Sequence, residues 1–177
     1  MKPFAALASV AALLSLALSP AASAQDKPGP LAGGRMVGMG SSFAAGSGFG
    51  PLKPETPQRC GRRIDNYATL VAEKLRMLLV DVSCGGATSA YVLGPWNELP
   101  PQIEAVTPDT ALVTITVGGN DIGYVGYLIA ESCKVRGPIL LGAAGTTCPD
   151  VPVPGEEAYF ALENNLLAIA EEVRRRA

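Results

Sequence analysis

The sequence predicts an α/β protein built on a parallel sheet, and three observations lead to this fold class. First, three short apolar runs have the length of strands, at residues 36–39, 77–82 and 111–117. Second, segments with helical patterns lie between and after these runs. Third, each run ends abruptly in glycine and small polar residues. Alternating strands and helices pack as a parallel sheet with right-handed crossovers.

The first apolar run, residues 36–39, is too short for a helix and predicts a buried strand. Gly40, Ser41 and Ser42 follow where this strand ends, and a turn of helix begins at Phe43. Ligands of open α/β sheets bind beyond the carboxyl ends of the strands, so a serine here is a candidate nucleophile. The alternative is that Ser41 or Ser42 only caps the following helix. A dinucleotide-binding fingerprint is excluded because Phe43 occupies its third small position.

The remaining segments predict one long loop and several helices. Residues 45–63 are too rich in glycine and proline for a core element, and loops of this length are usually functional or tied down. Asn66 opens a helix. The expected buried face of that helix consists of its large apolar residues: Tyr67, Leu70, Val71 and Leu75. Further helices are expected at residues 100–106, 122–131 and 156–176, with an irregular excursion at 132–154.

The pattern looks unfinished for an α/β fold. The run at 77–82 is apolar apart from Asp81, and we expect a parallel strand that is buried on both faces. Three strands form only a small sheet with an exposed edge. The apolar face of the last helix, residues 156–176, would normally cover another strand. We therefore expect exposed hydrophobic surface or partial disorder along this helix.

Residues 1–24 have the composition of a secretory signal peptide. A basic residue precedes an apolar run over residues 4–18, and a small-residue cleavage site ends at Ala24. The alternative, a membrane anchor, is disfavoured because the run is too short to span a bilayer comfortably. No later stretch could span one, so we expect no stable membrane insertion. The expectation is a secreted or periplasmic protein cleaved after Ala24, with a flexible leader at 25–34 and one domain at 35–177.

The composition excludes several classes of partner and site. The formal net charge is −2, and no clustered basic face predicts a nucleic-acid partner. Four cysteines in an exported chain indicate two disulfides with three possible connectivities. Sequence-local pairing would join Cys60 to Cys84 and Cys133 to Cys148. A zinc site is not expected, because the spacings match no zinc pattern and the sequence contains no histidine.

Three motifs are expected to meet at one edge of the sheet, since the carboxyl ends of parallel strands point the same way. They are Gly40-Ser41-Ser42, Cys84-Gly85-Gly86-Ala87 and Gly118-Gly119-Asn120-Asp121. Acyl transfer needs a nucleophilic hydroxyl and donors for the oxyanion of the tetrahedral intermediate. Ser42 can supply the hydroxyl and its own N–H, Gly86 a second N–H and Asn120 a side-chain amide.

Each motif has a simpler interpretation when taken alone. Gly85 and Gly86 could form a tight turn. Asn120 or Asp121 could cap the next helix. The joint occurrence of the three motifs favours the catalytic interpretation.

The three motifs together resemble the SGNH (GDSL) family of serine esterases and lipases, in particular its secreted bacterial lipase-like branch. Residues 100–123 are especially similar, and the resemblance covers about residues 35–177. It implies a three-layer α/β/α sandwich around a parallel sheet of about five strands. It also implies Ser42 as nucleophile, with Gly86 and Asn120 in the oxyanion hole and no cofactor.

Two departures from the family pattern are visible. Ser41 stands where the family usually has aspartate, which is expected to change local hydrogen bonding rather than the chemistry. The family's C-terminal Asp-x-x-His block, which supplies the general base, is absent from this chain, so we expect the C-terminal strands to be missing.

Two functions follow as hypotheses. The first is an exported ester hydrolase that acts on a small-molecule or lipid ester through an acyl-enzyme on Ser42, represented by a truncated chain with little activity of its own. The alternative is a non-catalytic secreted binding module, or decayed enzyme, derived from the same fold. The substrate's acyl length and the oligomeric state are not indicated by the sequence.

Overall fold

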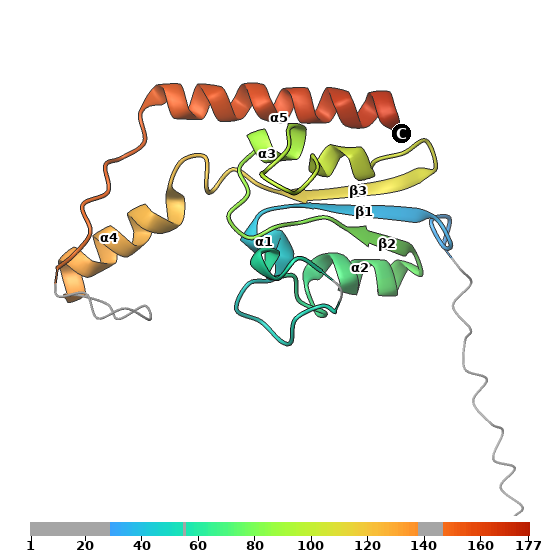
Figure 1. Ribbon diagram of the computed structural model, residues 1–177, viewed down its shortest axis with the longest axis horizontal. Coiled ribbons are helices and arrows are strands. Elements are labelled where there is room, and N and C mark those ends of the chain that lie inside the picture. Colours follow the sequence, from blue (N-terminus) through green and yellow to red (C-terminus); the bar gives the residue numbers. More distant parts are fainter. Residues whose placement is uncertain (1–28, 55, 138–146) are drawn as a thin grey trace, which may run out of the picture.

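The computed structural model describes residues 29–54, 56–137 and 147–177. The predicted signal peptide and the start of the leader lie outside these residues. The centre of the fold is a three-stranded parallel sheet (Figure 1), whose strands are β1 (Arg35–Gly40), β2 (Leu78–Asp81) and β3 (Thr110–Thr116). β1 pairs with both of the others, so the strand order is β2-β1-β3. The predicted α/β class with a parallel sheet is confirmed.

Helices cover both faces of the sheet, which gives three layers. α2 (Tyr67–Leu75) packs on one face, while α3 (Ala90–Leu93), the 3-10 helix η2 (Gln102–Ala105) and the long α5 (Glu156–Arg176) lie over the other (Figure 1). The central strand alternates between the two layers, as the period-2 geometry of a strand requires. Met36 joins the core under α2, whereas Val37 and Met39 join the core under η2 and α5.

α2 begins where the sequence predicts, but the face that it buries is only partly the predicted one. The Asn66 side chain accepts a hydrogen bond from the Thr69 N–H at 3.0 Å and so caps the helix. The fully buried residues of α2 are Ala68 and Ala72. Of the predicted face, Tyr67 and Val71 are partly buried against this core, whereas Leu70 and Leu75 are exposed. The small face is required because α2 approaches Gly38 of β1 closely: a Cβ on Gly38 would lie 3.0 Å from the Ala68 Cβ.

β2 is an edge strand rather than the doubly buried strand that its apolar run predicts. Leu78 is 68% exposed, and the other residues of the strand are only half-buried. The reason is the strand order, because β1 takes the central position. A largely apolar run therefore does not distinguish a central strand from an edge strand.

The predicted exposed hydrophobic surface along the last helix is confirmed. α4 (Tyr124–Arg136) lies to the side of the sheet in Figure 1, and α5 extends beyond the core. The large exposed apolar side chains on β3, α4 and α5 include Ile115, Val125, Leu128, Phe160, Leu166 and Leu167. Within the described part of the chain, no helix is both long enough and apolar enough to cross a membrane.

Both sequence-local disulfides are present, and one of them closes the long loop onto the second motif. Cys60 bonds to Cys84, and Cys133 bonds to Cys148. Cys60 and Cys84 are buried in a small cluster with Ala87, and the Gly85 N–H donates to the Cys60 carbonyl at 2.8 Å. The loop is therefore tied down at the position where the second motif begins.

Replacing both Cys60 and Cys84 with alanine is expected to lower the free energy of unfolding by about 3 kcal/mol, because the cross-link removes chain entropy from the unfolded state. Urea denaturation followed by circular dichroism measures this loss. The matched control is the Cys133→Ala/Cys148→Ala pair, which also loses a disulfide but lies outside the cluster around Ala87. Loss of either disulfide should lower the free energy of unfolding. Only the Cys60→Ala/Cys84→Ala variant should also show faster hydrogen exchange at residues 84–87. Equal exchange in the two variants would contradict this role.

Candidate active site

The end of β1 is held in an unusual backbone conformation that only glycine accepts readily. Gly40 has φ +126°, and a Cβ there would lie 2.2 Å from the Thr116 carbonyl oxygen. The buried Gln102 side chain accepts a hydrogen bond from the Gly40 N–H at 2.7 Å and donates one to the Gly40 carbonyl at 3.1 Å. The Cys84 N–H donates to the same carbonyl at 2.9 Å. Gly40 thus joins the first motif to the start of the second.

Ser42 is the first residue of α1 (Ser42–Ala45), directly beyond the carboxyl end of β1. The preceding Ser41 is buried, and its N–H donates to the Thr116 carbonyl of β3 at 2.9 Å. Ser41 is the N-cap residue of α1, and its carbonyl accepts a hydrogen bond from the Ala45 N–H at 2.9 Å. Within the described residues its side chain makes no capping hydrogen bond, so a side-chain cap by Ser41 is not supported. The Ser42 N–H has no acceptor among these residues and is available to a ligand.

A small pocket adjoins Ser42. Its volume is about 170 Å³, and its other walls are formed by Phe43, Gly46, Ser47, Phe49 and Val125. Phe43, Phe49 and Val125 are exposed to solvent, so the pocket opens at the surface. The walls are mainly apolar, which suits a hydrocarbon group next to the serine hydroxyl.

The second motif presents Gly86 at an exposed turn after the disulfide. Gly86 has φ +86°, and its missing side chain is required because a Cβ would lie 3.1 Å from the Trp96 ring edge. Among residues 29–54, 56–137 and 147–177, no acceptor binds the Gly86 N–H. Trp96 itself is held by stacking with Tyr91 at 4.6 Å and by the Arg59 guanidinium at 4.2 Å.

The third motif contacts the second motif directly. The Asn120 side-chain amide donates to the Ala87 carbonyl at 2.8 Å, which places Asn120 beside the turn that carries Gly86. The Asp121 carboxylate accepts hydrogen bonds from the Ser89 N–H and from the Ser89 hydroxyl. Asn165 of α5 donates to the same hydroxyl at 2.9 Å. Two adjacent residues of the third motif therefore hold the loop that follows Gly86.

The capping alternatives for Asn120 and Asp121 are not supported by this geometry. α4 begins at Tyr124 with Gly123 as its cap, and no side chain of the described residues caps it. Asp121 instead binds the N–H of Ser89, which is the cap residue of α3. The Asp121 carboxylate therefore does lie at a helix N-terminus, but the helix is α3, which precedes Asp121 in the sequence.

The strand order explains why the three motifs meet. The chain passes from β1 outward to β2 and then returns past β1 to β3, so the direction of winding reverses between β1 and β3. Ligands of doubly wound sheets bind at this switch point, beyond the carboxyl ends of the strands. Ser42 follows β1 and Asn120 follows β3, with Gly86 after β2. No hydrogen bond among the described residues joins Ser42 to Gly86 or to Asn120.

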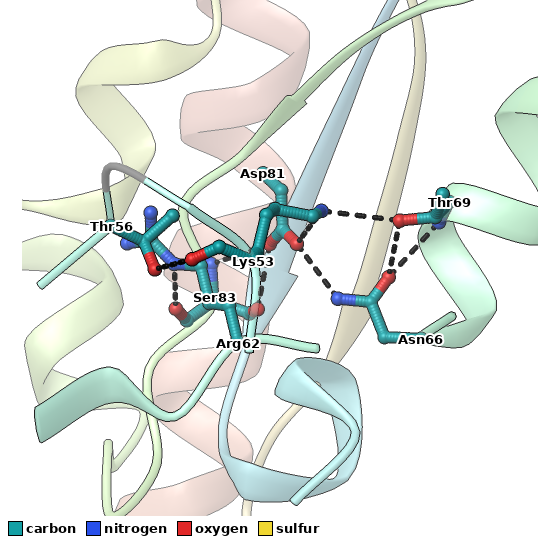
Figure 2. A network of polar contacts seen from close by, with 7 residues as sticks. All are labelled: Lys53, Thr56, Arg62, Asn66, Thr69, Asp81 and Ser83. Carbon is teal, nitrogen blue, oxygen red and sulfur yellow. Dashed lines mark hydrogen bonds and ion pairs between the residues drawn. The ribbon is translucent and has the colours of Figure 1, made fainter. Parts of the chain in front are cut away.

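A buried carboxylate, Asp81, supports the site from the end of β2 (Figure 2). The Asp81 side chain is 3% exposed and forms an ion pair with Lys53 at 2.7 Å. It also accepts hydrogen bonds from the Asn66 amide at 2.7 Å, and from the Ser83 N–H at 3.1 Å and hydroxyl at 2.7 Å. This network joins the long loop, the start of α2 and the segment before Cys84.

The pKa of Asp81 is lowered despite its burial. Desolvation is the largest single influence and raises the pKa, but the hydrogen bonds from Lys53, Ser83 and Asn66 and the charge of Lys53 together outweigh it. The carboxylate is thus ionised at neutral pH and fully occupied by its partners, so its role is to position the loop and the second motif.

The sequence analysis missed Gln102, Ser89 and Asn165 as supports of the site. Gln102 follows two prolines, and nothing in its neighbourhood indicates that its amide reaches Gly40, 62 residues away. Ser89 and Asn165 lie 76 residues apart in the sequence and likewise carry no motif. Only the apolar neighbours Pro101 and Ile103 could have suggested a buried polar side chain with a structural partner.

The fold and the three motifs define a class of protein. A profile of the GDSL-like lipase/acylhydrolase family matches residues 39–177, and the chain belongs to this family. Among individual proteins, the chain is 35% identical over 116 residues to Lipase 2 of Streptomyces coelicolor, and 31% identical over 138 residues to an esterase of Streptomyces scabiei. These alignments cover 64% and 68% of this chain, but 38% and 37% of the two relatives.

Solved structures show the same fold. Phospholipase A1 from Streptomyces albidoflavus NA297 and an extracellular lipase from Streptomyces rimosus each superpose with a TM-score of 0.56 at 24% identity. The superpositions cover 82% and 81% of this chain and 56% of each of the two structures. The chain therefore spans less than two-fifths of the two curated relatives and just over half of these solved structures.

Proposed function

We propose that this chain carries the nucleophile and the oxyanion hole of a serine ester hydrolase. The observation that carries the proposal is the placement of Ser42, Gly86 and Asn120 beyond the ends of three parallel strands at the switch point of the sheet. The N–H groups of Ser42 and Gly86 have no acceptor among the described residues, as donors to a developing oxyanion require. Family membership and the relatives named lipase and esterase support the same chemistry.

In this mechanism the Ser42 hydroxyl attacks the carbonyl carbon of an ester. The oxyanion of the tetrahedral intermediate accepts hydrogen bonds from the Ser42 N–H, the Gly86 N–H and the Asn120 amide. Collapse of the intermediate releases the alcohol and leaves an acyl-enzyme on Ser42, which water then hydrolyses. The apolar pocket beside Ser42 favours a hydrocarbon acyl group.

The serine proton requires a base, and the 177 residues contain no histidine. Removing one member of a catalytic triad leaves only the residual catalysis of the oxyanion hole and of substrate binding. We therefore expect slow acylation by this chain alone. The alternative function is a binding module that retains the pocket without turnover.

We also propose that the protein is exported. The N-terminal signal pattern, two disulfides and a structural neighbour described as an extracellular lipase support this localisation.

A fluorophosphonate probe tests the proposed nucleophile, because it traps an activated serine covalently. We expect labelling of the purified chain at Ser42, identified by peptide mass spectrometry, and its loss in Ser42→Ala. Ser41→Ala is the matched control and should keep the label. Asn120→Ala should slow labelling roughly 100-fold, as loss of one oxyanion donor does. Added imidazole should accelerate labelling of the parent chain.

Labelling at a different serine would contradict the assignment of Ser42. A chain that binds the pocket-sized ester reversibly but is not labelled, even with imidazole, would favour the binding-module function instead.

A further inference from the structure

A second cavity, distinct from the serine pocket, lies beside the end of β2. Its volume is about 280 Å³. It is lined by Val82 directly after β2, Tyr91 on α3 and Ala105 on η2, together with residues of the loop between α3 and η2. It shares no lining residue with the pocket beside Ser42. The proposed ester hydrolysis makes no use of this space.

Most of the cavity wall is apolar or aromatic. Tyr91 and Trp96 stack with their ring centroids 4.6 Å apart and their planes within 10° of each other. The Arg59 guanidinium, 4.2 Å from the Trp96 ring centroid, holds the tryptophan from outside the cavity lining. Val82 and Leu99 complete an apolar surface. Such a wall suits a hydrocarbon body rather than a strongly hydrated ligand.

Arg62 contributes a cation with unused hydrogen-bond donors to this cavity. Its Nε donates to the Ser83 carbonyl at 2.6 Å, which orients the guanidinium (Figure 2). Its two terminal nitrogens have no acceptor among the described residues. The nearby Asp81 carboxylate accepts no hydrogen bond from these nitrogens; its donors are Lys53, Asn66 and Ser83. Burial lowers the pKa of Arg62 more than the charge of Asp81 raises it.

We propose that this cavity binds a small monocarboxylate with an apolar body. The carboxylate would accept two hydrogen bonds from the terminal nitrogens of Arg62, since a guanidinium matches a carboxylate in this bidentate geometry. The hydrocarbon body lies against Trp96 and Leu99. Glu104 also lines the cavity but is exposed, so water reduces its repulsion of the bound carboxylate without removing it.

The cavity adjoins two supports of the candidate active site. The Trp96 ring edge stands against Gly86, and the lining residue Gln102 holds both backbone polar groups of Gly40. A ligand here contacts side chains that position the first and second motifs. The binding proposal itself is independent of the proposed catalysis and is tested without it.

The test is a titration of the purified chain with sodium octanoate, followed by tryptophan fluorescence. Trp96 is the one tryptophan in the sequence and lines the cavity, so its emission reports binding there. Octanamide is the neutral comparison ligand of the same length. We expect octanoate to bind at least about 10-fold more tightly than octanamide, because hydrogen bonds to charged groups are stronger than neutral ones. This advantage should fall as the salt concentration rises.

Three variants and one control make the assignment specific. Arg62→Gln should weaken octanoate at least about 10-fold and leave octanamide unchanged. Glu104→Gln should strengthen octanoate by roughly 2-fold, since it removes a like charge. Ala105→Leu should abolish both fluorescence responses by filling the cavity. Arg136→Gln, on the exposed end of α4, should change nothing.

Equal binding of octanoate and octanamide would overturn the proposal, as would an unchanged octanoate affinity in Arg62→Gln. A fluorescence response that survives Ala105→Leu would place the ligand elsewhere, for example in the pocket beside Ser42, and would equally overturn it. If Arg62→Gln does not fold, as judged by circular dichroism, the opposite effects of Glu104→Gln and Ala105→Leu decide the outcome.

Discussion

Replacing Gly40 with alanine is expected to prevent this chain from folding stably. The new Cβ would lie 2.2 Å from the Thr116 carbonyl oxygen and 2.8 Å from two other backbone atoms of the same residue. The φ of +126° adds strain for any residue with a side chain. Neither Gly40 nor Thr116 can move easily. The Gly40 backbone is hydrogen-bonded to the Gln102 side chain and to the Cys84 N–H, and the Thr116 carbonyl accepts a hydrogen bond from the Ser41 N–H.

The cost combines backbone strain and overpacking, and we expect a loss of about 4 kcal/mol or more. This is close to the whole free energy of unfolding of many single domains, which is about 5–15 kcal/mol. Urea denaturation followed by circular dichroism measures the loss, and phosphonate labelling of Ser42 should disappear with it.

Gly48→Ala is the matched control for Gly40→Ala. Gly48 also has a positive φ, of +93°, but a Cβ there would meet nothing within 4 Å. Its replacement should cost only the strain, about 1 kcal/mol. Similar urea midpoints for the two variants would show that the contact with Thr116 relaxes at little cost.

Asp81→Asn is expected to lower the free energy of unfolding by about 3 kcal/mol. The substitution keeps the size of the side chain but removes the charge opposite Lys53, and it places an N–H₂ group among donors. Removing one partner of a buried ion pair is typically this costly, because the other charge remains. Lys53 is 21% exposed, so part of its charge can be hydrated after the change.

The effect of Asp81 should depend on pH with a definite sign. The pKa of Asp81 is lower in the folded chain than its ordinary value of about 3.9. Its ionised form therefore stabilises the fold fully at pH values well above 3.9. This contribution is lost as the pH falls below about 3.9 towards the folded pKa. The difference in unfolding free energy between the parent chain and Asp81→Asn should shrink across this acidic range.

Two controls bear on the interpretation of Asp81. A double-mutant cycle with Lys53→Met should show strong coupling, because the two side chains are in direct contact. Glu172→Gln, in contrast, should change stability little, although Arg175 and Arg176 lower the pKa of Glu172 to about 2. Glu172 lies on the surface, where water screens the pair. Additive effects of the Lys53 and Asp81 substitutions would contradict the network described above.

Local patterns in the sequence determined most of the secondary structure. The capping asparagine at position 66 and the helix at Glu156–Arg176 lie where composition and periodicity predict them. The three strands and the small-residue motifs after them were predicted for the same reason, since strand length and punctuation are properties of neighbouring residues. The candidate residues Ser42, Gly86 and Asn120 could be named from these motifs.

The tertiary structure decided which faces are buried and how the site is supported. The β2-β1-β3 order made β2 an edge strand and left Leu78 exposed, which no pattern within residues 77–82 could indicate. Close approach of α2 to Gly38 selected Ala68 and Ala72 for the core instead of the larger leucines.

The residues that support the site likewise depend on tertiary contacts and not on local sequence patterns. Gln102 reaches Gly40 across 62 residues, and Asp121 reaches Ser89 across 32. Periodicity and propensity act over a few residues, whereas these hydrogen bonds depend on which strands become neighbours. The sequence by itself therefore determined the elements and the reactive groups at their ends. The strand order decided how those groups are held, because it brings residues that are distant in the sequence into contact.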